Sequence, residues 1–218
     1  MRHGTKTQSV ILTSLIFASA SSMASQGEYF FRPAFGISSL SNTDGDTTSI
    51  GNTDGRADVE LGNGFNAGLG VGYHYTDQIA IELFWEYRSN ESETTIADGT
   101  QFTEGNYASN IFFLNGHYYF QSDSNWRPYL GAGLGWVQEI DIDLESNGVE
   151  LSYSGDGDIT YQAFAGIDYQ LNPSISINTE LRYQTLSSVD LSEEGGEGSF
   201  SGLQYNPITL QLGLTWRF

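Results

Sequence analysis

Several features that would point to a function are scarce or missing in this 218-residue chain. It has no cysteine, which says little about its compartment, because an exported domain of this size does not need disulfides. Lysine and arginine together number 8, against 27 aspartate and glutamate residues, and the formal net charge is −19. Phosphate binding needs a basic surface, so the composition argues against nucleic acid as a partner.

The chain also lacks an apolar run of the roughly 20 residues that a membrane-spanning helix needs. The run at residues 10–18, VILTSLIFA, is much shorter. It follows a basic N-terminus and precedes the small residues Ser22-Met23-Ala24, an order typical of a secretory signal peptide. We therefore predict a signal peptide over 1–24, with Ala20 as a second candidate cleavage position, and one exported domain over 25–218.

Alternation of apolar and polar residues runs through this mature domain. In the C-terminal stretch, every second residue from Leu210 to Phe218 is large and apolar. A period of two is the pattern of a β-strand with one apolar and one polar face. Eight such segments occur, each close to the roughly 9 to 11 residues that a tilted strand needs to cross a membrane. They cover about residues 28–40, 61–75, 78–90, 105–120, 127–143, 157–170, 174–188 and the C-terminal stretch.

The connections between these segments alternate between short and long. Short connections follow the second, fourth and sixth segments, and the long ones cover residues 41–60, 91–104, 144–156 and 189–203. Short periplasmic turns and long outer loops are the layout of outer-membrane barrels. The sequence therefore predicts an all-β fold, an eight-stranded antiparallel up-and-down transmembrane β-barrel.

The polar face of the segments carries many charges, so the predicted barrel has a polar lumen and an apolar outer face. Ile140 and Ile142 are placed on the outer face. Charges in such a lumen must pair, and we predict a polar network of Arg32, Glu82, Glu86, Arg88, Glu180 and Arg182. With eight strands, side chains about fill the interior, so a wide aqueous pore is not expected. The full predicted inward set is Arg32, His74, Glu82, Glu86, Arg88, His117, Glu139, Asp168, Glu180, Arg182, Gln184, Gln211 and Arg217.

Three stretches resemble the small outer-membrane barrels grouped with OmpA/OmpX/OmpW-type domains and opacity-like surface antigens. They are GAGLGWVQ at 131–138, YQAFAGIDYQLNPSISINTELRYQ at 161–184 and LQLGLTWRF at 210–218. The resemblance implies a Gram-negative, porin-like outer-membrane protein. It also implies that the barrel assembly machinery reads Trp216 and Phe218 as an assembly signal. Outer-membrane lipids and lipopolysaccharide are then expected partners.

Function is less well defined by the sequence than fold. The four long connections, counted with their edges, are strongly acidic. We predict a non-enzymatic structural or surface-interaction role through these acidic loops, with a host or surface ligand. No cofactor is expected, although Asp44, Asp46 and Asp54 are candidates for weak Ca²⁺ binding, because oxygen-rich turns suit calcium. One alternative is a narrow OmpW-type channel for small or hydrophobic solutes. A third is lipid A modification, for which His74 and His117 are the only histidines of the mature domain.

Overall fold

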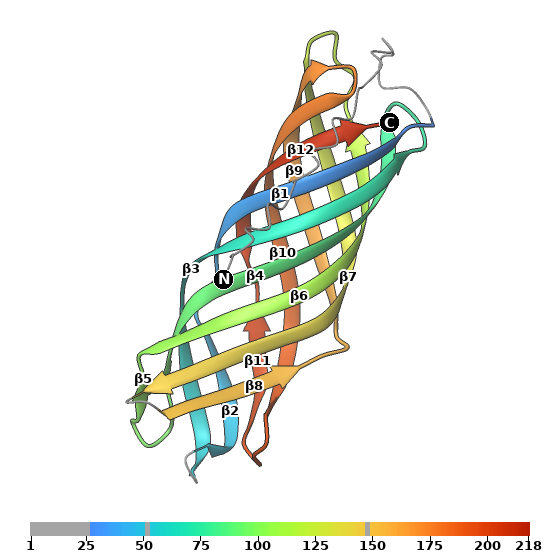
Figure 1. Cartoon of the computed structure of the whole chain (residues 1–218). Coiled ribbons are helices and arrows are strands. Elements are labelled where there is room, and N and C mark those ends of the chain that lie inside the picture. Colours follow the sequence, from blue (N-terminus) through green and yellow to red (C-terminus); the bar gives the residue numbers. More distant parts are fainter. Residues whose placement is uncertain (1–26, 51–52, 147–148) are drawn as a thin grey trace, which may run out of the picture.

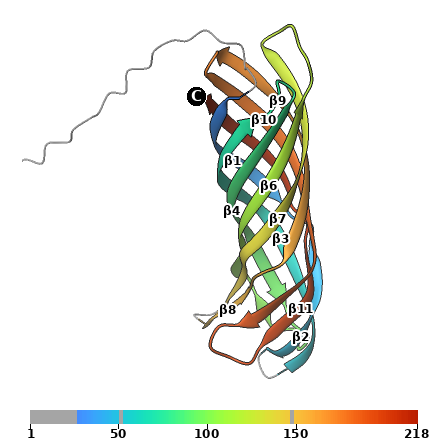
Figure 2. The ribbon, with the colours of Figure 1, turned by 90° about the vertical axis from the view of Figure 1, so that its right-hand side faces the viewer.

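The computed structural model describes residues 27–50, 53–146 and 149–218. The predicted signal peptide lies outside the described residues. Within them, no helix is long and apolar enough to cross a membrane. The described chain forms a tall barrel of tilted strands (Figures 1 and 2).

Twelve strands, all paired antiparallel, make up the sheet in the described part of the chain. The predicted count of eight is therefore not confirmed. Four additional strands, β2, β5, β8 and β11, form largely within the segments predicted as loops. The strands are β1 (Tyr29–Ser39), β2 (Thr43–Ile50), β3 (Thr53–His74), β4 (Ile79–Thr95), β5 (Gln101–Phe102), β6 (Glu104–Tyr119), β7 (Trp126–Ser146), β8 (Val149–Gly155), β9 (Ile159–Asn172), β10 (Ile175–Glu193), β11 (Ser199–Tyr205) and β12 (Ile208–Arg217).

The pairings close into two rings stacked along the barrel. In the first, which we call the proximal section, the order β1, β3, β4, β6, β7, β9, β10, β12 returns to β1. In the second, the distal section, β2 replaces β1, β8 replaces β9 and β11 replaces β12. Five long strands run through both. Figure 1 shows β2, β5, β8 and β11 gathered at the end opposite the C-terminus.

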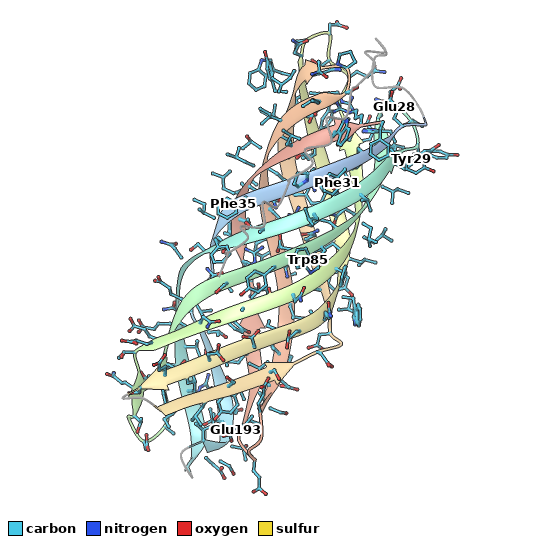
Figure 3. All side chains as sticks on the ribbon, in the orientation of Figure 1. Glu28, Tyr29, Phe31, Phe35, Trp85 and Glu193 are labelled. Carbon is cyan, nitrogen blue, oxygen red and sulfur yellow. The ribbon has the colours of Figure 1, made fainter. Side chains whose placement is uncertain are left out.

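Short polar turns close the proximal end. The Thr76 hydroxyl accepts hydrogen bonds from the amides of Gln78 and Ile79, and the Asn172 amide oxygen accepts from Ser174 and Ile175. Such side-chain bonds to nearby backbone are what Thr and Asn contribute to turns. In Figure 3, Tyr29 lies at this end and Glu193 at the other.

The proximal wall is apolar outside and polar inside, as predicted. Leu83 and Leu212 are 52% and 60% exposed, whereas their neighbours Glu82 and Gln211 are fully buried. Large side chains on the lumen side fit because glycines face them: a Cβ at Gly70 would collide with the Glu82 carboxylate. An outer surface of this kind suits an apolar surrounding.

The predicted parity fails in one stretch of β7. Glu139 was expected inside but is exposed, and Ile140 and Ile142 were expected outside but are buried. The register between β6 and β7 shifts there, because Val137 pairs with Ile111 and Glu139 with the adjacent Asn110. One extra residue in a strand is a β-bulge, and it exchanges the two faces of everything beyond it.

Candidate functional site

Six charged side chains meet inside the proximal section. They are Arg32 on β1, Glu82, Glu86 and Arg88 on β4, and Glu180 and Arg182 on β10, and we call this set the ionic plug. All six sequence-predicted network residues are therefore brought together. Alternate positions of each strand point into the lumen, which is why 82, 86 and 88 share one face of β4.

The plug is a continuous chain of alternating charge. Arg88 binds Glu86 (Nη2 to Oε1, 2.6 Å), and Arg182 binds the other oxygen of Glu86 (Nη1 to Oε2, 3.1 Å). Arg182 also donates from Nε and Nη2 to Glu180 Oε1, at 3.1 and 2.6 Å. Arg32 then joins Glu180 (Nη1 to Oε2, 3.5 Å) to Glu82, with two bonds of 2.7 Å to Glu82. No plug carboxylate is left without an arginine.

Further polar and aromatic side chains complete the coordination of the plug. Around Glu82, Asn115 donates at 3.0 Å and His117 Nε2 lies 3.2 Å from the same oxygen. The Tyr129 hydroxyl donates to Glu180 at 2.9 Å. The ring of Phe84 contacts two guanidinium groups, and its centroid lies 4.9 Å from Arg32 Cζ and 4.8 Å from Arg182 Cζ. Guanidinium groups bind aromatic faces favourably, and more so when desolvated.

These contacts close the lumen. Each plug side chain is at most 4% exposed, and the three arginines balance the three glutamates. Removing charges from water is costly unless every charge is paired and hydrogen-bonded, and here the pairing is nearly complete. Among the described residues, then, the plug forms a neutral barrier across the barrel.

The interior of the distal section is apolar, a feature that the sequence analysis missed. We call the buried apolar side chains there the distal core, and each is at most 9% exposed. Register shifts in β3 between Leu61 and Gly64, in β7 near Gln138 and in β10 near Ser188 exchange the inner and outer faces of these strands. The distal core consists of Leu40, Ile50, Ala57, Val59, Leu61, Ile96, Phe102, Tyr107, Ile140, Ile142, Leu144, Tyr153, Leu186, Val189, Leu191, Phe200, Leu203 and Tyr205.

The wall between β1–β2 and β11–β12 has a stretch that no strand ladder holds. Pairing of β1 with β12 ends at Ser39 and Ile208, and pairing of β2 with β11 resumes only at Asp46 and Ser201. We call the intervening residues, 40–45 and 202–207, the seam. Its edge contains Pro207, which has no amide hydrogen to donate.

The Thr43 side chain and apolar packing hold the seam. The backbone amide of Gln204 donates to the Thr43 hydroxyl at 2.9 Å. Three residues of the seam, Leu40, Leu203 and Tyr205, are buried and belong to the distal core. The apolar interior is thus separated from the surroundings by a part of the wall with few backbone bonds.

The three aspartates predicted as weak calcium ligands lie on strands. Asp44 and Asp46 are exposed on β2, and Asp54 is exposed on β3. Asp44 pairs with Arg56, and an Asp54 oxygen accepts from the Ser49 amide at 2.8 Å. Within the described ranges, no group of three or more His, Asp and Glu side chains is placed to hold a metal ion.

The predicted assembly residues lie at the proximal end. Phe218 is 68% exposed, and its ring centroid is 6.0 Å from that of Trp216. The Phe218 backbone exchanges hydrogen bonds of 2.9 and 3.1 Å with Tyr29, which joins the two ends of the barrel wall. His74 and His117, considered for lipid A chemistry, are both buried inside the proximal section. Neither faces the outside of the wall.

Comparisons with known proteins agree with this architecture. A family model for the outer membrane protein beta-barrel domain matches residues 10–218. The chain is 23% identical over 200 residues to Outer membrane protein W of Vibrio cholerae, covering 88% of this chain and 89% of that protein. It is 24% identical over 165 residues to Outer membrane protein AlkL of Ectopseudomonas oleovorans, covering 74% and 70%. The crystal structure of OprG from Pseudomonas aeruginosa matches with a TM-score of 0.67 at 16% identity, covering 90% of this chain and 98% of that one.

Proposed function

Because the chain belongs to the outer membrane protein beta-barrel family, we propose that eight strands of its proximal section span the outer membrane and that the barrel passes small apolar solutes. The short turns and the C-terminus then face the periplasm, and the distal section stands outside the cell. In this orientation the ionic plug lies at membrane depth. The distal core and the seam lie above it.

The change of interior polarity along the barrel carries this proposal. An apolar solute that enters from outside makes contacts with the distal core, and these contacts bury the apolar surface of the solute. The plug below it presents paired charges, which such a solute cannot replace as hydrogen-bond partners. The seam adjoins the distal core where the β1–β12 ladder of the proximal section ends, and strand pairing is interrupted there, as it also is along β10 between Thr185 and Ser192. The solute therefore leaves sideways, through the seam, into the membrane.

Reconstituted vesicles test this function. We expect the purified barrel to speed the uptake of an apolar fluorescent solute, while planar bilayers containing it show little steady ion conductance. Replacing Glu180 by Ala leaves Arg182 without one of its two carboxylates and should raise that conductance. A large, stable conductance in the wild-type barrel without accelerated uptake would contradict the proposal.

A second candidate is the surface-interaction role, favoured by the acidic outer face of the distal section. Asp44, Asp46, Asp58 and Glu60 point outward from β2 and β3, so ordered strands, more than loops, hold these charges. Such a surface attracts cationic partners, and the attraction is screened by salt. Calcium titration of an Asp44→Asn/Asp46→Asn variant tests it. The result expected from this role is weaker binding with unchanged solute uptake.

A further inference from the structure

A cluster of two arginines and one histidine lies at the periplasmic mouth, beneath the plug. It comprises Arg127 at the start of β7, Arg217 at the end of β12 and His74 at the end of β3, and we call it the mouth cluster. The described chain has six arginines and no lysine. Three arginines belong to the plug and one to the distal section, so both remaining arginines are at this mouth.

Two of the three side chains contact the same aromatic ring, that of Tyr119. The Arg127 guanidinium carbon lies 4.1 Å from the centroid of the Tyr119 ring, and the His74 ring centroid lies 5.4 Å from it. Arg127 is the register partner of Asp168, and the Asp168 carboxylate accepts a hydrogen bond of 2.8 Å from Arg217. Residues from three strands that are distant in sequence therefore converge at one level of the lumen.

Several nitrogen atoms of the mouth cluster have no hydrogen-bond partner within the described residues. They are Nε and Nη1 of Arg217, Nε of Arg127 and both ring nitrogens of His74. Arg217 is 4% exposed and His74 1% exposed. A buried donor without a partner is costly, so such groups are normally satisfied by a ligand, an ion or water.

Asp168 and Asp77 do not fill this role. Asp168 accepts from Arg217 Nη2 at 2.8 Å and from the Ser176 hydroxyl at 2.6 Å, and it leaves the remaining Arg217 nitrogens free. Asp77 contributes its backbone carbonyl to Arg127 at 3.2 Å, and its side chain is exposed.

We propose that the mouth cluster binds one small oxyanion, a phosphate or carboxylate group, from the periplasmic side. A guanidinium presents several N–H donors in a fixed fork that suits such oxygens, and two guanidiniums with an imidazole can surround one anion. This site is independent of solute passage, because it lies on the other side of the plug from the seam. The phosphate can be free in the periplasm or can belong to a lipid headgroup at the rim.

Phosphate titration of the refolded barrel tests the proposal. In micelles of an uncharged detergent, inorganic phosphate should shift the backbone amide resonances around Tyr119 and saturate. Arg127→Gln should weaken this binding about tenfold, the effect expected for losing one charge-assisted hydrogen bond. Arg56→Gln, which makes the same charge change in the distal section, should leave it unchanged.

A second variant and a titration with lipid distinguish the possible sources of the anion. Arg217→Gln should weaken binding as well. Arg217 precedes the terminal Phe218, so if that variant fails to assemble, the partly buried Arg127 decides the test. Phosphatidylglycerol added without inorganic phosphate should shift the same resonances if the source is a headgroup, and should not if it is a free ion. Absence of saturation with either ligand, or equal affinity of the wild type and Arg127→Gln, would overturn the proposal.

Discussion

Arg32 and Glu82 form a two-bond ion pair across the lumen, with Nε to Oε1 and Nη2 to Oε2 both at 2.7 Å. The two residues are 50 positions apart and sit on β1 and β4, which are not paired with each other, since β3 lies between them. The pair therefore connects parts of the wall that no backbone ladder joins directly. Fork geometry of this kind is the strongest form of arginine–carboxylate contact.

Breaking this pair on one side should destabilise the barrel more than removing both partners. Glu82→Gln leaves the Arg32 charge buried with only part of its compensation, and such a change typically costs about 3–5 kcal/mol. The double variant Arg32→Leu/Glu82→Leu should cost less, because it leaves neither charge behind. Urea unfolding in lipid vesicles measures both. If the double variant were the less stable one, the plug would not act through charge balance.

The cost of a charged substitution on the outer face of the wall should depend on whether the position lies in the membrane. Leu212 points outward from β12 in the proximal section, where an arginine at mid-membrane costs about 2–4 kcal/mol. Thr48 points outward from β2 in the distal section, outside the membrane. We therefore expect Leu212→Arg to lower the free energy of unfolding strongly and Thr48→Arg to change it little. Equal losses of unfolding free energy in a urea titration would show that the membrane boundary proposed here is wrong.

Asp141, in the distal part of β7, should make the stability depend on pH. Partial burial, followed by the charges of Asp143, Glu139 and Glu194, raises the pKa of Asp141 to about 6 from an ordinary 3.8. The folded state thus holds this proton more tightly than the unfolded state, and stability falls as the pH rises from about 4 to about 6.

Asp141→Asn removes that penalty. Above pH 6 the variant should melt at a higher temperature than the wild type, and below about pH 4 the difference should disappear. Thermal melts at both pH values provide the check. A difference of the same size at both would assign the effect to something other than ionisation of Asp141.

The C-terminal aromatic should govern assembly. Phe218 is exposed at the proximal end beside Trp216 and Tyr29, where it is accessible to an assembly factor. Deleting Phe218 should reduce the amount of barrel in the outer membrane and leave protease-sensitive chain in the periplasm. Heat-modifiable migration in gels measures the folded fraction. Wild-type abundance of folded protein after the deletion would exclude this role.

Period-two alternation was sufficient to predict the proximal wall, because one parity there is apolar and the other polar over whole strands. It located Glu82, Glu180 and Arg182 on the lumen side without any structure. It could not locate the bulges, since an inserted residue such as Gln138 leaves no mark on composition. Beyond a bulge the same alternation continues with its faces exchanged.

The distal strands were missed for a different reason. Residues 41–60 are predicted as a long connection because they lie between the first two alternating segments. They are also rich in glycine, asparagine and aspartate, which are typical of turns. Yet Ala57-Asp58-Val59-Glu60-Leu61 alternates strictly, and that signal could have identified the distal half of β3. The contacts of the mouth cluster depend on three strands meeting, which spacing along the chain does not reveal.

A reversible disulfide across the seam tests the central claim most directly. The chain has no cysteine, so introduced pairs act without background. A Cβ at Gly45 would lie 3.2 Å from Leu203 Cγ, which places Gly45→Cys/Leu203→Cys within reach of a disulfide. The control pair is Val59→Cys/Thr94→Cys, two buried register partners on strands that are already hydrogen-bonded to each other.

Uptake of an apolar fluorescent solute into vesicles is the measurement. If solutes leave through the seam, oxidising the Gly45→Cys/Leu203→Cys variant should slow uptake severalfold, and a reductant should restore it. Oxidising the control pair should have no effect. Unchanged uptake through a fully oxidised seam would contradict the lateral route.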